Sequence, residues 1–388
     1  MRVGIVEICV KEHYMVVNAV LKTYSSQASN EVYVFTLAEA VDLIQGGQDL
    51  GSNVHFVIMD ATKPVADFLN QVEAYNLDRV HLTTVTKYFK AFYHFKPKTA
   101  QLFFHFHNID LWFESAISIQ AKRLWKAYFI DKIKFEWATQ IKYSVKDIFR
   151  DIYRKKFIKR LAKDKAKWIV LSEAQKKVLS QYIDVSNAIV FPTLIFEPNL
   201  HQDLSVKGAK LRICIPGSVT QVRREYEQLF NMIELNFDWV KTHFSFDLLG
   251  FVPPNETHLL ERIKALESNG LAIDYYTSFL EVKQFDLNLY AADILLSNLL
   301  LVQNEAIQTK ETATVFHMVR GVKPGIFPQA FQLDSDLEAS VIKFKDYQDL
   351  LRVFHVLIDE PEQLIALKQK AESLSKSYTP EYLYKRLS

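Results

Sequence analysis

Short apolar runs alternate with helix-length segments along the first part of this chain, and this alternation constrains the fold more than any other feature. Each run is rich in Val, Ile and Phe, and the segment after it has the periodicity of an amphipathic helix. Strands that alternate with helices in this way form βαβ units with a parallel sheet. We therefore predict an α/β fold with a doubly wound first domain. The apolar runs are VGIVEICV from Val3, EVYVFTL from Glu31, VHFVIMD from Val54, RVHLTTV from Arg79 and AQLFFHFH from Ala100.

The same alternation returns in the second half, with the runs RICIPG, FSFDLLG, LAIDYY, DILLSN and PGIFP. A chain of 388 residues is long enough for two domains. The segment EPNLHQDLSVKGAK between the two halves lacks apolar periodicity and is predicted to be a linker. We expect a Rossmann-like domain over residues 1–200, a linker over 201–210, a second Rossmann-like domain over 211–372 and a terminal segment over 373–388. The two domains are expected to face each other across a cleft.

The cysteine content and the short apolar segments indicate a soluble, cytoplasmic protein. Cys9 and Cys214 both lie in apolar runs, and two cysteines are too few for a disulfide framework or a zinc site. The N-terminal apolar run is short and is interrupted by Glu7, unlike a secretory signal. The stretch LYAADILLSNLLLV is broken by Asp293 and Asn298, which argues against a membrane-spanning helix.

Positive charge is concentrated between Lys122 and Lys167. This stretch holds 16 Lys and Arg against 5 Asp and Glu, whereas the whole chain has a net charge of only +2. Interleaved aromatic and basic residues suit an anionic membrane surface, where Trp and Tyr lie at the level of the headgroups. An amphipathic helix with its aromatics in the core is the alternative. We expect no nucleic acid as partner, because no nucleic-acid-binding module accompanies the basic stretch. The aromatic residues are Trp125, Tyr128, Phe129, Phe135, Trp137, Tyr143, Phe149, Tyr153 and Phe157.

Polar residues follow several strands of the first domain. The carboxyl ends of parallel strands meet at one edge of a doubly wound sheet, and ligands bind there. This placement makes all of these residues candidates for a binding site. They are Glu7, Asp60, Thr83, Thr84, His105, His107 and Asn108.

The segment LRICIPGSVTQVRREYEQLF, from Leu211 to Phe230, is typical of a phosphate-binding turn. The strand ends at Pro216, and Gly217 lets the backbone turn closely before a helix that would point its free N–H groups at a ligand. We expect Arg223 and Arg224 about one turn into this helix, where their guanidinium groups could clamp phosphate oxygens. An ordinary βα unit with solvated arginines is the alternative.

The order of these parts resembles the GT-B superfamily of nucleotide-sugar-dependent glycosyltransferases, in particular its group 1 or family 4-like type. LRICIPGSVTQVRREY is similar to the family's strand, glycine turn and basic helix start, and DLLGFVPP to its next strand. IDYYTSFLEVKQFDLNLYAADILLSN resembles the loop that contacts the donor base, a helix ending in Y-x-x-A-D and a further strand. KETATVFHMVRGVKPGIFP resembles the helix and G-x-P turn over the donor phosphates. In the first half, FFHFHNIDLWF is similar to the family's H-N strand end, and VFPTLIFEP to the strand entering the linker.

The resemblance implies an enzyme that moves a sugar from a nucleotide-diphosphate sugar to a carbohydrate acceptor, without a metal ion or a cofactor. The acceptor could be a lipid-linked glycan in bacterial cell-surface polysaccharide assembly, with the protein peripheral at the inner face of the membrane. Cationic side chains and helix N-termini would stabilise the leaving diphosphate. The donor-binding residues would be Gly217, Ser218, Thr220, Arg223, Arg224, Phe279, Lys310, Glu311, Thr312, Ala313 and Thr314.

The first half would supply the groups that activate the acceptor. His107 is the preferred general base, because it follows an apolar strand beside Asn108, and a buried structural histidine is the alternative. Thr220 could instead cap a helix, and Phe279 could instead belong to the core. The expected catalytic residues are His107, Glu7 and Arg223, and the expected acceptor-side residues are His13, Asn108 and Asp110.

The chain departs from the family pattern before the G-x-P turn. Many retaining members carry two glutamates eight positions apart there, whereas Glu305 and Glu311 are six positions apart. The stereochemical outcome therefore stays open, and so do two alternatives: a non-hydrolysing epimerase, and a catalytically inactive glycosyltransferase-like subunit. The terminal segment SYTPEYLYKRLS is similar in position to the helix that returns to the first domain in this superfamily.

Overall fold

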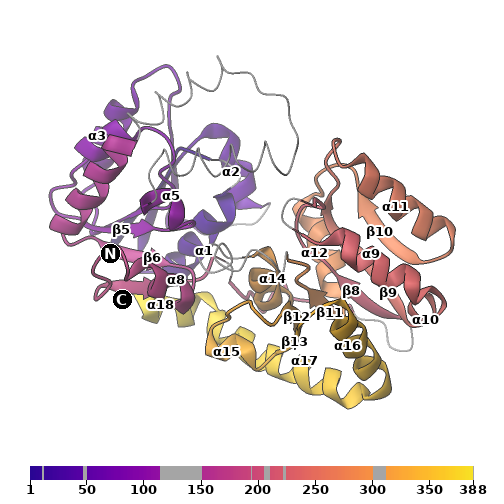
Figure 1. Cartoon of the computed structure of the whole chain (residues 1–388). Coiled ribbons are helices and arrows are strands. Elements are labelled where there is room, and N and C mark those ends of the chain that lie inside the picture. The colour runs from indigo at the N-terminus through magenta and orange to yellow at the C-terminus, as the bar shows by residue number, and fades with distance from the viewer. Residues whose placement is uncertain are drawn as a thin grey trace. The chain divides into compact units, whose positions relative to one another are not determined.

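The structure, a computed structural model, describes residues 1–10, 13–46, 50–113, 151–193, 195–204, 210–221, 224–299 and 312–387. The chain divides into two compact units (Figure 1). One comprises residues 1–191 together with Leu387, and the other comprises residues 192–386. Each unit contains a parallel sheet flanked by helices, which confirms the predicted α/β class with two Rossmann-like domains.

The described part of the first unit is built on a seven-stranded parallel sheet with the order β3-β2-β1-β4-β5-β6-β7. The order changes direction beside β1, so the chain winds first to one side and then to the other. Most of β1 is buried, which explains why it has a continuous apolar run. The strands are β1 (Arg2–Glu7), β2 (Glu31–Thr36), β3 (Val54–Ile58), β4 (Arg79–Leu82), β5 (Gln101–His105), β6 (Lys167–Val170) and β7 (Ala188–Val190).

Helices follow the strands of this sheet in βαβ order. A helix over residues 151–163 packs on the core through Phe157, whose ring centroid lies 5.6 Å from that of Phe104 and 6.2 Å from that of Trp112. These rings belong to one aromatic core beneath the helices. The other helices are α1 (Tyr14–Ser25), α2 (Ala38–Gln45), α3 (Val65–Glu73), α4 (Phe89–His94), α5 (Asp110–Phe113) and α8 (Glu173–Leu179).

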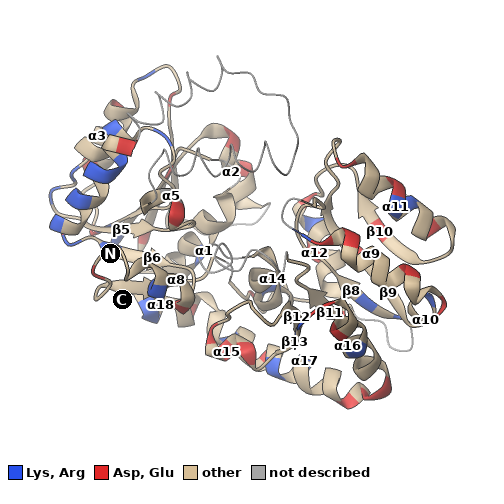
Figure 2. Ribbon diagram, viewed as in Figure 1, with Lys and Arg blue, Asp and Glu red and all other residues tan. Residues whose placement is uncertain are grey.

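The described part of the basic stretch, residues 151–167, includes an amphipathic helix. Phe157 is fully buried, whereas the lysines of the opposite face are exposed (Figure 2). Residues 151–167 therefore fit the alternative interpretation of the basic stretch, an amphipathic helix with its aromatic residues in the core and its charges in water. The rest of the predicted basic surface, residues 122–150, lies outside the described residues. The exposed lysines are Lys155, Lys156, Lys159 and Lys163.

The described part of the second unit contains a six-stranded parallel sheet with the order β10-β9-β8-β11-β12-β13. Asp293, the end of the Y-x-x-A-D motif, precedes β11 and has a structural role. Its carboxylate accepts a hydrogen bond of 3.0 Å from the backbone N–H of Arg212 and one of 2.6 Å from Lys368. The strands are β8 (Leu211–Cys214), β9 (Phe244–Phe251), β10 (Ala272–Tyr276), β11 (Ile294–Leu296), β12 (Gly325–Pro328) and β13 (Val341–Phe344).

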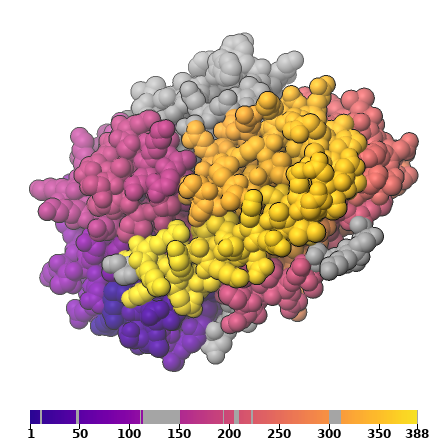
Figure 3. All heavy atoms as spheres, turned by 90° about the horizontal axis from the view of Figure 1, so that it is seen from below, coloured from indigo at the N-terminus to yellow at the C-terminus, as the bar shows by residue number. Residues whose placement is uncertain are grey.

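Helices cover this second sheet as well. α16 packs against α17, and their yellow atoms form a continuous part of the surface in Figure 3. The helices are α9 (Tyr226–Leu235), α10 (Phe237–His243), α11 (Thr257–Ser268), α12 (Val282–Ala291), α14 (Ala313–Gly321), α15 (Ser335–Glu338), α16 (Tyr347–Asp359), α17 (Pro361–Ser375) and α18 (Pro380–Leu387), with a short 3₁₀ helix, η2 (Lys376–Tyr378).

Leu387, the last residue of α18, is assigned to the first unit. The guanidinium of Arg79 donates a hydrogen bond of 2.5 Å to the carbonyl oxygen of Leu387, the α18 residue that belongs to this unit. Among the described helices, none has the length and apolar character that crossing a membrane requires.

Candidate active site

Neighbouring strands of the first sheet bring Glu7, Thr83, Thr84 and His107 together. The strands β1, β4 and β5 are adjacent and parallel, so their carboxyl ends lie at the same edge. Glu7 is the last residue of β1, the two threonines follow β4, and His107 follows β5. Side chains far apart in the sequence therefore form one cluster.

The carboxyl group of Glu7 is buried among hydrogen-bond donors, and the residue is only 1% exposed. Oε1 accepts from the backbone N–H groups of Cys9 at 3.0 Å and Val10 at 3.1 Å. Oε2 accepts from the Thr83 hydroxyl at 3.0 Å. Burial outweighs these donors and raises the pKa of Glu7 to about 7.

The imidazole rings of His13 and His107 lie with their centroids 5.0 Å apart. Nε2–H of His107 donates to the carbonyl oxygen of Thr83 at 2.5 Å, which leaves the lone pair of the neutral ring on Nδ1. Burial is the main reason that the pKa of His107 is lowered to about 4, so the ring is neutral at physiological pH. His13 precedes α1, and its Nδ1 lies 2.7 Å from Oγ1 of Thr84.

Asp60, Asn108 and Asp110 were also predicted at this edge. Asp60 follows β3, and its carboxylate accepts a hydrogen bond of 2.9 Å from the backbone N–H of Thr62 in a local turn. Asn108 precedes α5 and Asp110 begins it, and both side chains are half-buried.

His105 belongs to a buried hydrogen-bonded chain that sequence reasoning did not identify. Nε2 of His105 lies 2.9 Å from Nδ1 of His81, and Nε2 of His81 lies 2.9 Å from the Tyr24 hydroxyl. Arg79 donates to that hydroxyl at 3.2 Å. Burial lowers the pKa of both histidines, that of His81 to about 3, so both are neutral.

In the second unit, the predicted glycine turn follows β8 and runs beside β9. The backbone N–H of Gly217 donates to the carbonyl of Leu249 at 2.9 Å, and that of Val219 to Phe251 at 3.0 Å. Gly217 has a φ of 108°, a conformation that favours glycine. A Cβ on Gly250 would lie 2.2 Å from the carbonyl oxygen of Gly217, so both positions require glycine.

The predicted position of Arg224 inside a helix is wrong, because α9 begins at Tyr226. Arg224 forms an isolated antiparallel bridge with Leu299, and its Nη2 donates to the carbonyl oxygen of Pro216 at 2.6 Å. The residue is only 6% exposed. These tertiary contacts divert the backbone from the helix and place the guanidinium under the glycine turn. Arg223, the other predicted clamp, lies outside the described residues.

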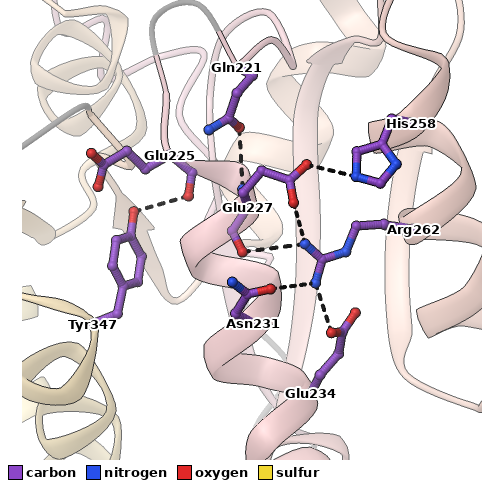
Figure 4. Close-up of polar contacts among 8 residues, drawn as sticks. All are labelled: Gln221, Glu225, Glu227, Asn231, Glu234, His258, Arg262 and Tyr347. Atoms are coloured by element: carbon purple, nitrogen blue, oxygen red, sulfur yellow. Dashed lines mark hydrogen bonds and ion pairs between the residues drawn. The ribbon is translucent and has the colours of Figure 1, made fainter.

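The start of α9 is held by polar contacts with α11 (Figure 4). Arg262 of α11 pairs with Glu227 at 2.5 Å and with Glu234 at 2.8 Å, and donates to Asn231 at 2.9 Å. The backbone N–H of Glu227 donates to the side chain of Gln221 at 3.2 Å. The segment between the glycine turn and α9 is thus anchored at its helical end.

Buried polar groups follow the end of β11 and lie in the first half of α14. Within the described residues, Ser297 Oγ, Asn298 Nδ2, Thr314 Oγ1 and His317 Nδ1 are buried and have no hydrogen-bond partner. Burial, and then the charges of Arg320 and Arg224, lower the pKa of His317 to about 3. Buried polar groups of this kind require an explanation, and a polar ligand supplies one.

Thr312 precedes α14 and Ala313 is its first residue, as the predicted helix start requires. Sequence reasoning named Thr314 but missed Ser297, Asn298 and His317. Ser297 and Asn298 could have been found from the sequence, because they are the polar pair that ends the apolar run DILLSN.

The remaining predicted donor residues have different surroundings. Phe279 is 82% exposed and its ring centroid lies 4.3 Å from that of Phe251, so it is not a core residue. The Thr220 hydroxyl donates to the carboxylate of Glu256 and does not cap α9. Ser218 is half-buried in the glycine turn. Lys310 and Glu311 lie outside the described residues.

In the part of the chain that the structure describes, no cluster of His, Cys, Asp or Glu side chains is placed to hold a metal ion. No protein-family model matches this chain, and no curated protein does either. Solved structures do match. A glycosyltransferase from Rickettsia africae is 11% identical with a TM-score of 0.61, and the match covers 100% of this chain and 96% of that one. Anabaena HepE, solved in complex with UDP-glucose, is 10% identical with a TM-score of 0.58, over 100% of this chain and 98% of that one.

The chain has the GT-B fold. The resemblance that the order of motifs indicated is thus confirmed at the level of the fold. GT-B similarity also extends to a putative UDP-N-acetylglucosamine 2-epimerase from Listeria monocytogenes, which is 13% identical with a TM-score of 0.54, over 100% of this chain and 94% of that one.

Proposed function

We propose that this protein is a glycosyltransferase that moves a sugar from a nucleoside-diphosphate sugar to a hydroxyl group of a carbohydrate acceptor. The observation that carries the proposal is the set of buried polar atoms on Ser297, Asn298, Thr314 and His317, which lack partners among the described residues. Hydrogen-bonding groups at a helix start, next to a guanidinium, suit a diphosphate. The Anabaena protein was solved with UDP and with UDP-glucose, which supports this ligand class.

The chemistry follows from where charge develops. Breaking the bond between the sugar and the diphosphate builds negative charge on the leaving group. We infer that the N-terminus of α14 and the buried Arg224 stabilise this charge, so that neither a metal ion nor a cofactor is needed. In the first unit, the neutral His107 ring keeps the lone pair on Nδ1, and this nitrogen can accept a hydroxyl proton.

Epimerisation is the second candidate. The similarity to the Listeria epimerase, with a TM-score of 0.54, favours it. Both reactions use a nucleotide sugar, so ligand binding alone does not separate them. Transfer of the sugar to an added glycan supports the first candidate, and conversion of the free nucleotide sugar to its epimer supports the second.

A panel of nucleoside diphosphates and nucleotide sugars tests the proposal. A ligand that binds only the folded protein raises the unfolding temperature, and about 100 Kd of ligand adds about 2.7 kcal/mol of stability. We expect one nucleoside diphosphate and its sugar derivative to stabilise the protein. We then expect diphosphate release that depends on a glycan acceptor. If the donor binds without release or epimerisation, the protein is an inactive binding subunit and the proposal fails.

We further propose that the acceptor is a lipid-linked glycan and that the first unit binds an anionic membrane. The helix of residues 151–163 carries exposed lysines and lies beside α4, because Tyr153 packs on Tyr93 with ring centroids 6.4 Å apart. α4 and the loop after it carry further exposed lysines, which extend the basic face. Such a face attracts anionic headgroups at about 1 kcal/mol per lysine. The added lysines are Lys90, Lys96 and Lys98.

A further inference from the structure

Tyr88 has a backbone conformation that tyrosine rarely adopts. Its φ is 58° and its ψ is 28°, in the left-handed region, where the Cβ of an L-residue crowds the following carbonyl oxygen. Glycine and asparagine tolerate this region best. The other described non-glycine residues with a positive φ each follow the end of a helix, where a left-handed residue is common. They are Asn76, Lys165 and Val322.

Tyr88 instead precedes a helix. It is the N-cap residue of α4, and a residue in that position usually has an extended backbone. Contacts on both sides fix its backbone. Sγ of Cys9 lies 3.9 Å from the carbonyl oxygen of Lys87. Phe89, the first residue of α4, is buried with its ring centroid 5.6 Å from that of Trp112. These contacts explain the turn, but they do not explain why a tyrosine occupies it.

The side chain of Tyr88 gains little from the fold. The residue is 43% exposed, and its ring and hydroxyl form no ring contact or hydrogen bond with the described residues. Tyr182, which is 45% exposed, instead stacks on Phe113 with ring centroids 4.6 Å apart. A residue that strains the backbone and leaves its ring in water requires another explanation. Strained residues of this kind cluster at binding sites.

Tyr88 lies at the end of a segment that begins in the candidate active site. The carbonyl oxygen of Thr83 accepts from Nε2–H of His107, and Oγ1 of Thr84 lies 2.7 Å from Nδ1 of His13. Four peptide units join Thr84 to Tyr88, and they span at most about 14 Å. A glycan whose reacting hydroxyl meets His107 can therefore reach Tyr88 with a neighbouring sugar.

A carbohydrate suits an exposed aromatic ring at this place. One face of a pyranose ring presents mainly C–H groups, which pack on an aromatic face while the hydroxyl groups stay in water. A surface that inserts into a membrane instead presents several neighbouring apolar side chains. Phe89 and Phe92 are buried here, and the exposed neighbours are Lys87 and Lys90. The isolated ring therefore fits a sugar better than a lipid layer.

We propose that Tyr88 is a specificity-determining residue on which a sugar ring of the acceptor glycan stacks. The stacked ring is a neighbour of the sugar that carries the reacting hydroxyl, so Tyr88 selects an oligosaccharide over a single sugar. That this oligosaccharide is the acceptor rests on the proposed glycosyl transfer, whereas its stacking on Tyr88 is measurable without any reaction.

Binding of free oligosaccharides to the full chain tests the proposal. An array of lipid-free oligosaccharides and monosaccharides identifies a ligand, and calorimetric titration gives its Kd. Tyr88→Asn should raise the Kd at least about tenfold and leave the unfolding temperature unchanged or higher, because asparagine tolerates the left-handed backbone. Tyr88→Phe should bind within about twofold of the native protein, because it keeps the ring.

Three results of the titration would overturn the proposal. One is that the native protein binds no oligosaccharide, or binds the monosaccharide equally well. Another is a native Kd in Tyr88→Asn. The third is an equal loss of affinity in Tyr88→Phe, which would show that the hydroxyl rather than the ring makes the contact.

Lys165 offers a matched control for the backbone. Its φ is 54° and it is exposed, and it precedes β6 at the opposite edge of the same parallel sheet. Lys165→Asn should leave oligosaccharide affinity at the native value. An equal loss of affinity in Lys165→Asn and Tyr88→Asn would contradict a contact at Tyr88. A lower unfolding temperature in Tyr88→Asn alone would assign the ring a structural role and overturn the proposal.

Vesicle flotation separates the sugar from a lipid surface. Tyr88→Asn should float with anionic vesicles to the same extent as the native protein. If it loses flotation and keeps the native oligosaccharide affinity, the ring serves the membrane and the proposal is wrong.

Turnover separates this inference from the proposed function. Tyr88→Asn should raise the KM for the acceptor about tenfold and leave the KM for the donor unchanged, because the ring meets only the acceptor. A native acceptor KM would overturn the role of Tyr88 while the proposed function stands. If the native protein releases no diphosphate with any glycan, the proposed function fails, and the titration by itself decides whether an oligosaccharide stacks on Tyr88.

Discussion

A Cβ placed on Gly250 would lie 2.2 Å from the carbonyl oxygen of Gly217, and 2.9 Å from the backbone nitrogen of Ser218. The two glycines therefore bring the end of β9 and the turn after β8 into backbone contact. No side-chain movement can relieve a clash there, because the neighbouring atoms are backbone. The glycine turn has its shape because both positions lack a side chain.

Gly250→Ala should displace the glycine turn. We expect the free energy of unfolding to fall by about 3 kcal/mol and the affinity for a nucleoside diphosphate to fall at least about tenfold. Chemical unfolding and calorimetric titration measure the two effects. Gly46→Ala is the control, since a Cβ there would meet nothing within 4 Å although its φ is 57°. The control should lose about 1 kcal/mol and bind normally. Equal binding by both variants would contradict a role for the turn.

Thr314→Val should separate binding from stability. The Thr314 hydroxyl is buried and has no partner among the described residues, so its removal should leave stability unchanged or raise it by about 1 kcal/mol. If the hydroxyl meets the donor, affinity should fall about tenfold. Thr23→Val removes a similarly buried, unpartnered hydroxyl from α1 and should not affect binding. Unchanged donor affinity in Thr314→Val would remove this residue from the site.

Phe279→Ala should weaken nucleotide binding without unfolding the protein. The residue is 82% exposed, so truncation should change stability by less than about 0.5 kcal/mol. Stacking on a base contributes about 1–3 kcal/mol, and we expect the Kd to rise about ten- to a hundredfold. Leu235→Ala is the matched surface control, at 85% exposure. A Kd that is the same in both variants would place the base elsewhere.

His81 and His105 should make the protein sensitive to acid. Burial depresses the pKa of each in the folded state, so their contribution to stability is fully present above the unfolded value of about 6.5 and is lost as the pH falls. Each buried neutral histidine costs about 1.4 kcal/mol per pH unit below that value. Urea unfolding between about pH 7 and 5 should show a steep decline that is flatter in the double variant His81→Gln, His105→Gln. If stability falls with pH equally steeply in the native protein and the double variant, other groups cause the decline. His94→Gln, at the surface, serves as the control.

The lysines of residues 151–163 should govern membrane binding. Lys159→Gln with Lys163→Gln should reduce recovery with anionic vesicles about tenfold or more, because each lysine near the surface contributes about 1 kcal/mol. The same charge change at the exposed Lys264 and Lys283 of the second unit should have little effect. Vesicle flotation at low and high salt measures both. Failure of the native protein to float at low salt, or an equal loss in both variants, contradicts the proposed surface.

Much of the architecture could be predicted from local patterns. The apolar runs correspond to strands β1 to β5 and β8 to β12, because a parallel sheet is covered on both faces and its strands need continuous apolar residues. Gly217 was also identified from a local pattern, because a close turn after a strand requires a backbone conformation that glycine adopts readily. That Glu7, Thr83, Thr84 and His107 follow strands was also visible in the sequence.

Local patterns failed where distant contacts override them. The run Arg-Arg-Glu-Tyr has no helix-breaking residue, yet Arg224 stays outside α9 because it bridges Leu299 and donates to the carbonyl of Pro216. Thr220 satisfies its hydroxyl on Glu256, which lies 36 positions away, instead of capping a helix. No short window of the sequence contains both Arg224 and Leu299, or both Thr220 and Glu256.

Local sequence patterns establish the order of strands and helices, and with it two parallel sheets whose polar residues collect at the carboxyl ends of the strands. Which of these polar groups meet, and in what state of charge, depends on the three-dimensional fold. Thr83 donates to Glu7, and Thr84 lies 2.7 Å from Nδ1 of His13, because three segments converge on one sheet edge. Glu7 acquired a pKa of about 7 because the fold removes its carboxyl group from water. Hydrogen bonding and desolvation depend on neighbours in space, and the sequence orders only neighbours along the chain.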